Sequence, residues 1–264
     1  MRTVQKEQVT NLYRLPEISE PELKALDRPL KIAYSRQHPR GGALSKDAAN
    51  ALETSHGALR ALGHTLEEVA LDVDQEAILH YYYLVMGLES GKLVREAEAT
   101  GKKVRWGEVD PLVWVAYQLA PHVPATAYSD FNAFQDQLFE YMELLYQDYD
   151  IYLTPTVSDV AMKNADLAYP PALLARIQEM DSLHASEVWD VTKATFDYTY
   201  LRTSYNQLMN ITGQPAISLP LFENADGLPL GTQLAAKRGD EYVLLQLAAQ
   251  LEAAGYLKAG NVEM

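Results

Sequence analysis

The sequence predicts an α/β fold in which helices flank a mixed, largely parallel sheet. Residues 30–71 have the order strand, helix, strand, and a crossover of this length joins parallel strands in a right-handed sense. Short apolar strands at 150–156 and 215–221 then alternate with long helical stretches. This alternation is typical of α/β proteins, whose helices bury one face on the sheet.

The composition is that of a folded protein with few specialised features. Hydrophobic residues make up 48% of the 264, so a core that buries roughly 70–75% of the unfolded surface is expected. A net charge of −14 argues against nucleic acid as a partner. The chain has no cysteine, which excludes disulfides and cysteine nucleophiles. A polar N-terminus and the lack of any window of ~18 apolar residues predict a cytoplasmic protein without membrane contact.

Two parts are expected along the chain. Residues 1–29 are predicted to be the remnant of an N-terminal helix followed by a connection rich in proline and acidic residues. Residues 30–264 are predicted to form the α/β domain.

The first strand, helix and strand have clear boundaries. A short strand is expected at 30–35, and a helix from about 47 to 62 begins after Ser45, whose hydroxyl can cap it. Gly63 can end this helix in the left-handed conformation. A second strand is expected at 64–71.

The middle of the chain is predicted to be helical. Helices are expected at 75–99, 110–119 and 129–146, and the last carries an apolar stripe made of Phe131, Phe134, Leu138, Tyr141, Met142 and Leu145. A third strand at 150–156 ends near a proline, and 171–209 is mostly helical. The three tyrosines at 81–83 favour core packing over a contact surface.

The C-terminal segment combines several turn signals. A helix ends in a glycine turn at Gly213, a short apolar strand covers 215–221, and a second strand lies within 226–235. The last helix, 240–254, is followed by Gly255 as its terminator.

Two motifs in this segment carry a family resemblance. Thr-Gly-Gln-Pro-Ala-Ile-Ser-Leu-Pro at 212–220 precedes Gly-Leu-Pro-Leu-Gly-Thr-Gln at 227–233, and a terminal helix follows both. This double motif resembles the C-terminal part of the amidase signature family, which hydrolyses amide C–N bonds. The resemblance covers most of the chain, and the residue pattern is similar to that of bacterial members that open small cyclic oligoamides.

The resemblance implies that the family's catalytic residues have no counterpart here. Members use a lysine, a serine in a cis peptide bond and a nucleophilic serine within a loop rich in glycine and serine. The nearest fragment, 41–46, is better explained as a loop plus the helix cap. We therefore assign no catalytic residue. Residues 1–5 align with the inside of a family helix, so the chain is expected to begin within an element.

Substrate-binding residues are expected where strands end. The carboxyl ends of strands line the ligand crevices of α/β sheets, and the resemblance places the same segments near the family's pocket. The candidates are Thr154, Thr156, Asn206, Asn210 and Gln233. The alternative is that Asn210 and Thr212 turn a helix end and that Gln233 satisfies backbone groups of the sheet.

No metal or cofactor is expected. His64 and Glu67 should lie on a strand, where side chains three apart face opposite ways, and the other histidines share no ligand spacing.

Three hypotheses for function follow. The favoured one is a pocket-forming C-terminal fragment of a hydrolase of non-peptide amide C–N bonds, inactive alone, with a separate N-terminal amidase piece as a candidate partner. The alternative is a non-enzymatic, homo-oligomeric or small-molecule-binding protein, a homodimer through surfaces that an N-terminal half would cover. The third is an enzyme with independent machinery, using Lys46 or a histidine.

Overall fold

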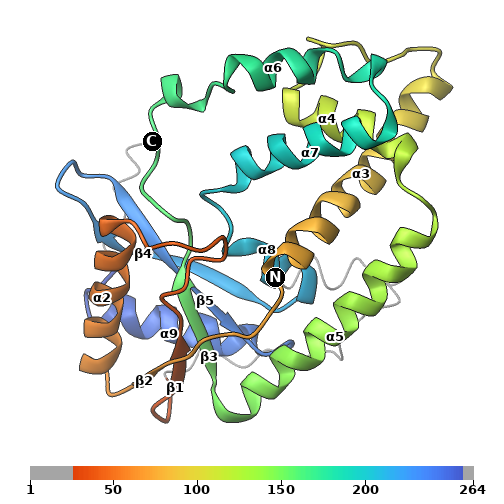
Figure 1. Ribbon diagram of the computed structural model, residues 1–264. Coiled ribbons are helices and arrows are strands. Elements are labelled where there is room, and N and C mark those ends of the chain that lie inside the picture. Colours follow the sequence, from red (N-terminus) through yellow and green to blue (C-terminus); the bar gives the residue numbers. More distant parts are fainter. Residues whose placement is uncertain (1–25, 258–264) are drawn as a thin grey trace.

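The computed structural model describes residues 26–257 and shows a sheet covered by helices (Figure 1). The expectations for 1–25, which are the helix remnant and most of the connection to residue 29, fall outside these residues.

The sheet of the described chain has five strands in the order β2-β1-β3-β5-β4. Their bounds are β1 (Lys31–Tyr34), β2 (Thr65–Glu68), β3 (Ile151–Pro155), β4 (Ala216–Glu223) and β5 (Pro229–Ala236). β1 is parallel to both of its neighbours, whereas β5 is antiparallel to both β3 and β4. β5 therefore runs against the other four strands, and the predicted mixed, largely parallel sheet is confirmed.

The α-helices of the described residues follow the predicted pattern closely. They are α2 (Lys46–Ala61), α3 (Gln75–Ala99), α4 (Pro111–Leu119), α5 (Thr126–Asp148), α6 (Pro171–Gln178), α7 (Ala185–Tyr200), α8 (Asn206–Thr212) and α9 (Glu241–Ala253). Three short 3₁₀ helices lie at Ala120–His122, Asn164–Leu167 and Met180–Ser182. The stretch 171–209, predicted to be mostly helical, is occupied by α6, α7 and the first part of α8.

Alternation along the strands separates two cores. Ile151 and Leu153 face the side covered by α2 and α9, whereas Tyr152 between them packs with residues of α5 and α8. Ala235 and its neighbour Leu234 on β5 divide in the same way. Because successive side chains of a strand point to opposite faces, both faces of the sheet are covered.

A third core lies away from the sheet, where α3, α4, α6 and α7 pack on one another (Figure 1). The rings of Tyr83 and Phe196 meet there with centroids 5.0 Å apart. Gly87 allows α3 and α4 to approach closely, since a Cβ on it would lie 2.7 Å from a methyl group of Leu119. Helix α3 therefore links the sheet layer to this helical layer. The core role predicted for the tyrosine run is met by Tyr83, which is buried.

The predicted ends of the elements are confirmed at three positions. The hydroxyl of Ser45 accepts a hydrogen bond from the Ala48 N–H at 3.0 Å. Gly63 and Gly213 have φ of 89° and 70°, the left-handed conformation that glycine adopts without steric cost.

His64 joins two distant elements and is buried. Its Nδ1 accepts the backbone N–H of Leu30 at 3.0 Å, so the proton of the neutral ring lies on Nε2, which is 3.0 Å from Oε1 of Gln250. The ring thus connects the start of β1 to α9. Glu67 is exposed on the neighbouring strand, as the alternation predicts.

We predict that this histidine makes the fold sensitive to acid. Burial holds the pKa of His64 below its usual value, so between that pKa and about 6.5 the unfolded chain binds more protons than the folded one. The stability linked to His64 should therefore be fully present above about pH 6.5 and be lost as the pH drops below that value. Urea unfolding at pH 7.5 and 5.5 measures this.

The variant His64→Gln should show a shallower decline, because one buried imidazole no longer titrates. His38, His56 and His80, whose pKa values are also lowered by the desolvation of their rings, keep part of the dependence. His122→Gln, at an exposed position, is the matched control. An unchanged slope in His64→Gln would contradict the assignment.

Candidate functional site

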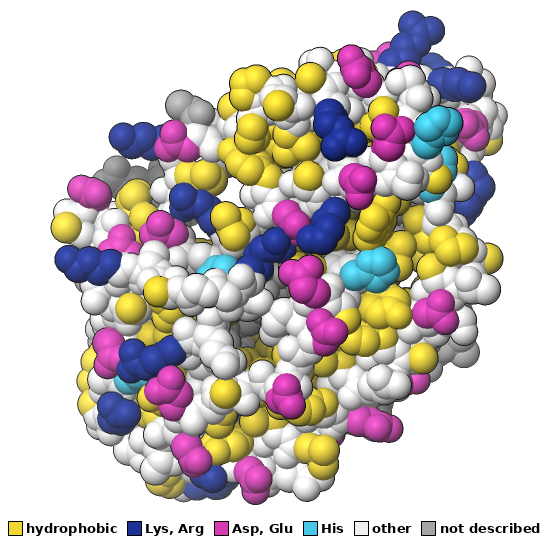
Figure 2. Space-filling view, in the orientation of Figure 1, with side chains coloured by type: hydrophobic (Ala, Val, Ile, Leu, Met, Phe, Trp, Pro, Cys, Tyr) yellow, Lys and Arg dark blue, Asp and Glu magenta, His cyan; other side chains and the backbone are white. Residues whose placement is uncertain are grey.

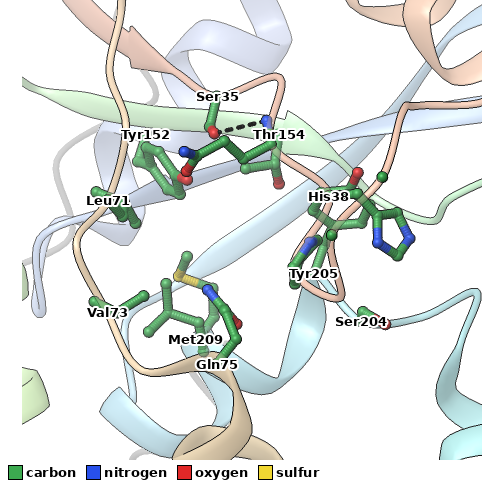
Figure 3. A pocket seen from close by; sticks show the side chains of 15 residues that line it. Ser35, His38, Leu71, Val73, Gln75, Tyr152, Thr154, Ser204, Tyr205 and Met209 are labelled. Carbon is green, nitrogen blue, oxygen red and sulfur yellow. Dashed lines mark hydrogen bonds between the residues drawn. The ribbon is translucent and has the colours of Figure 1, made fainter.

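A cavity of about 420 Å³ lies at the edge of the sheet where β1 and β3 end (Figure 3). The carboxyl ends of parallel strands meet at one edge of a sheet, and ligand crevices form outside it. The loop 35–42, the segment before α3 and the start of α8 complete the walls. The lining residues are Ser35, Gln37, His38, Pro39, Gly41, Gly42, Leu71, Val73, Gln75, Tyr152, Thr154, Ser204, Tyr205, Leu208 and Met209.

Thr154 and Gln233 on the strands, and Thr156 directly after β3, share one face of the sheet. Thr154 pairs in register with Gln233, and the hydroxyl of Thr156 lies 2.6 Å from that of Ser218. All lie on the face occupied by Tyr152, as alternation requires. Of the five predicted residues, only Thr154 lines the cavity. The hydroxyl of Thr156 is hydrogen-bonded to that of Ser218.

The two predicted residues on α8 lie outside the lining. Asn206 begins the helix and is partly buried, and Asn210 is exposed. The helix meets the cavity instead through Leu208 and Met209, which are buried and apolar. The contribution of α8 to the wall is therefore hydrophobic, and the proposed binding roles of the two asparagines stay predictions.

Two buried hydroxyl groups at the cavity have no hydrogen-bond partner in the described part of the protein. They are Oγ1 of Thr154 and Oη of Tyr205, on side chains that are each 4% exposed. A buried polar atom without a partner costs about 1–3 kcal/mol, so few are left in native structures. A ligand that bonds to these hydroxyls would recover that cost.

The side chains of His38 and Ser158 are hydrogen-bonded beside the cavity, and the imidazole is the donor of this bond. Its Nδ1 accepts the N–H of Arg40 at 3.1 Å, so the proton of the neutral ring lies on Nε2, 3.0 Å from Oγ of Ser158. That hydroxyl in turn directs its own proton to the carbonyls of Leu201 and Arg202. Burial, and then the charge of Arg40, lower the pKa of His38. A general base would need an unprotonated Nε2 facing the serine.

The serines of the lining are also held by the backbone. Ser35 accepts the N–H of Gln37 at 3.1 Å, and Ser204 donates to the carbonyl groups of Tyr200 and Leu201. Each hydroxyl therefore has a structural role at the end of an element, as serine often has in turns.

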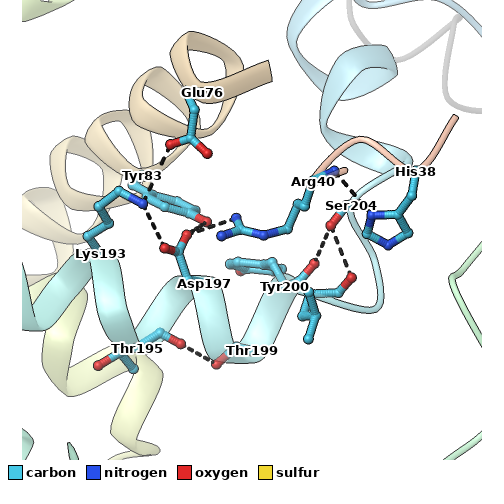
Figure 4. A network of polar contacts seen from close by, with 11 residues as sticks. His38, Arg40, Glu76, Tyr83, Lys193, Thr195, Asp197, Thr199, Tyr200 and Ser204 are labelled. Atoms are coloured by element: carbon cyan, nitrogen blue, oxygen red, sulfur yellow. Dashed lines mark hydrogen bonds and ion pairs between the residues drawn. The ribbon is translucent and has the colours of Figure 1, made fainter. Parts of the chain in front are cut away.

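The loop that follows β1 is tied to the helical layer through Asp197 (Figure 4). Arg40 donates to its Oδ1 at 2.9 Å, Tyr83 donates to the same oxygen at 2.8 Å, and Lys193 donates to Oδ2 at 2.7 Å. Lys193 also lies 3.5 Å from Glu76. Burial acts to raise the pKa of Asp197, but its three hydrogen-bond donors outweigh burial and hold the pKa below its usual range. The carboxylate is therefore charged at neutral pH.

The comparisons with known proteins identify the family. The amidase family profile matches residues 2–245. The chain belongs to the amidase family.

Its relatives include a lipoamidase and a cyclic-dimer hydrolase. A lipoamidase of Enterococcus faecalis is 30% identical over 236 residues, covering 86% of this chain and 31% of that protein. The 6-aminohexanoate-cyclic-dimer hydrolase of Pseudomonas sp. (strain NK87) is 28% identical over 232 residues, or 85% of this chain and 44% of that protein. The solved structure of 6-aminohexanoate cyclic dimer hydrolase with its substrate has the same fold, with a TM-score of 0.72 at 23% identity, over 96% of this chain and 51% of that one.

This amidase-family chain spans about half or less of the length of these relatives. The confirmed resemblance to the amidase family therefore applies to the segment that this chain shares with these longer relatives. Within the described residues, all peptide bonds are trans, and no group of three or more histidine, aspartate or glutamate side chains is arranged to hold a metal ion. No helix of residues 26–257 is long and apolar enough to cross a membrane.

Several cavity residues of this family member had no place in the sequence prediction. His38 and the glycines at 41 and 42 follow β1, so the rule that selected Thr154 after β3 could have selected them too. Tyr205 and the segment 71–75 reach the cavity only through the packing of α3 and α8, for which local sequence gives no signal.

We predict that Asp197→Asn loosens the loop that walls the cavity. Losing the charge shared by Arg40 and Lys193 should lower the free energy of unfolding by about 1–3 kcal/mol, because Asp197 and Arg40 are only 22% and 15% exposed. Urea unfolding measures the loss, and hydrogen exchange should be faster in 36–42.

The matched control is Glu67→Gln, which breaks the exposed pair with Lys31. Surface pairs of this kind contribute about 0–1 kcal/mol. Equal losses in the two variants would contradict a special role for Asp197.

Proposed function

We propose that this chain forms the substrate pocket of an amidase that acts on non-peptide amide C–N bonds. The observation that carries the proposal is the cavity at the strand ends, where the unpaired hydroxyls of Thr154 and Tyr205 lie in a lining without charged residues that also contains aliphatic side chains. An amide offers both a carbonyl acceptor and an N–H donor to such hydroxyls. The proposal places the chain in the cytoplasm, which fits its lack of cysteine.

The second part of the proposal is that the chain alone does not hydrolyse amides. Effective catalysis needs a nucleophile, an activating base and preorganised oxyanion donors together. Ser35, Ser204 and Ser158 are each held by the backbone, and His38 presents a proton to Ser158 instead of accepting one. Losing a nucleophile and base that act as a unit costs about a millionfold in rate. A separate N-terminal amidase piece would have to supply that unit.

The names of the relatives support the choice of substrate class. A lipoamidase and hydrolases of the 6-aminohexanoate cyclic dimer share most of this chain. A wall formed by Leu71, Val73, Leu208 and Met209 suits a substrate with an aliphatic segment.

We predict no turnover when the purified chain is incubated with hexanamide and with 6-aminohexanoate cyclic dimer. Release of ammonia or of the linear product, followed by mass spectrometry, should equal that of buffer alone. Turnover that phenylmethylsulfonyl fluoride abolishes would contradict the proposal. In that case His38→Gln and Lys46→Ala would show whether the third hypothesis, independent machinery, is correct.

A second candidate function is assembly with another chain. In the described sheet, β4 is an edge strand, and the side chains of Ala216 and Ser218 on it are exposed. Unpaired backbone groups of an edge strand can pair with a strand of a second copy. We therefore also propose a homodimer.

We predict that light scattering at micromolar concentration gives the mass of a dimer. Ser218→Pro, which removes a backbone donor from the edge strand, should shift the mass toward the monomer. The control is Asn210→Ser, a substitution at an exposed position that should leave the mass unchanged. Proline is not used at this position because it would break the helix. A monomer in the unmodified chain would rule this assembly out.

A further inference from the structure

The lining of the cavity contains no aspartate, glutamate, lysine or arginine among the described residues. Charged residues make up 22% of the chain, and Figure 2 shows acidic and basic side chains spread over the visible face. The lining therefore differs from this surface in having no charged side chain, and this difference affects which ligands the cavity can accept.

The titratable side chains of the lining are neutral at physiological pH. Burial lowers the pKa of His38 and raises the pKa of Tyr152 and Tyr205. Arg40 belongs to the same loop, but its guanidinium group turns away to Asp197. The pairing with Asp197 therefore directs this loop charge away from the cavity.

A second hollow of this protein provides an internal contrast. It has a volume of about 430 Å³ and lies between α3 and α7, where Asp74, Glu76 and Lys193 are part of its wall. The two hollows are of similar size, so neutrality is a property of the first cavity and not of hollows in general.

A charged ligand group would lose part of its hydration in the first cavity and find no opposite charge in its lining. Transfer of an unpaired carboxylate or ammonium group out of water is far more costly than transfer of an amide that gains hydrogen bonds. The amide can bond to the free hydroxyls of Thr154 and Tyr205, and its aliphatic segment can pack on Leu71, Val73 and Met209.

We propose that the cavity selects uncharged amides with an aliphatic segment and excludes ligands that present a carboxylate or an ammonium group to it. The inference rests on the proposed function, since it names the substrate class of the same site. In chemical terms, it favours amides whose ends are blocked or joined in a ring over open chains with ionised ends.

The experiment compares three ligands of equal length on the intact chain. Hexanamide, hexanoate and hexylammonium are titrated at pH 7 and followed by ligand-observed NMR. We expect hexanamide to bind at least about tenfold more tightly than either ion, which is a modest effect for an unpaired charge. Thr154→Val should weaken hexanamide binding by about 2–10-fold through loss of one hydrogen bond. Thr154→Ser should keep it, and the exposed Thr54→Val is the control.

A charge placed in the wall should invert the selection. Gln75 lines the cavity and is partly exposed, so it tolerates a charged side chain better than a core position. Gln75→Lys should improve the binding of hexanoate by about tenfold, and Gln75→Glu should do the same for hexylammonium. Gln178→Lys, at an exposed position on α6, is the matched control and should change neither.

The outcomes separate this inference from the proposal on which it rests. Binding of hexanamide with tenfold discrimination supports both. Equal binding of all three ligands overturns the charge selection but leaves a ligand pocket. Binding of none of them overturns the inference and the pocket together. The turnover assay reports separately on whether the chain hydrolyses amides alone.

Discussion

The cavity depends on one carboxylate, that of Asp197, which holds the loop after β1 against the helical layer. Arg40 from the loop and Tyr83 from α3 share one oxygen of this group, and Lys193 takes the other. Three elements that are distant in sequence therefore meet at one charge. A partly buried carboxylate with three donors is stable as an ion, whereas each donor would lose its counterpart if the charge were removed.

The same contact explains why a cavity without charge can form in a strongly acidic protein. The side chain of Arg40 is directed to Asp197, so what the loop presents to the cavity at the next two positions is the backbone of Gly41 and Gly42. Both glycines have positive φ, at 77° and 87°, a conformation that other residues rarely adopt. The charge pairs on one side of the loop, and the uncharged wall forms on the other.

Local features of this fold could be predicted from the sequence, and the contacts between distant segments could not. The helix that starts after Ser45 and ends at Gly63 is specified by its own cap residues, and Thr154 could be placed at the site because it ends a buried strand. The bond from Arg40 to Asp197 joins residues 157 positions apart, and no periodicity or turn signal connects them. Asn206 and Asn210 illustrate the same limit. The sequence selected α8 correctly as an element of the wall, but α8 lines the cavity with residues other than these two.

The arrangement of His38 follows from the same loop and bears on the division between binding and catalysis. The N–H of Arg40 bonds to Nδ1 of His38 within a turn that the Gly41 N–H closes on the His38 carbonyl at 2.8 Å, and the side chain of Arg40 ties this turn to Asp197. The proton of the neutral imidazole is thereby kept on Nε2, where it serves Ser158 as a structural donor. For the ring to act as a base, the loop would have to release its backbone contact and so disturb the wall of the cavity. The geometry that builds a binding site here thus opposes the protonation state that this histidine would need for catalysis.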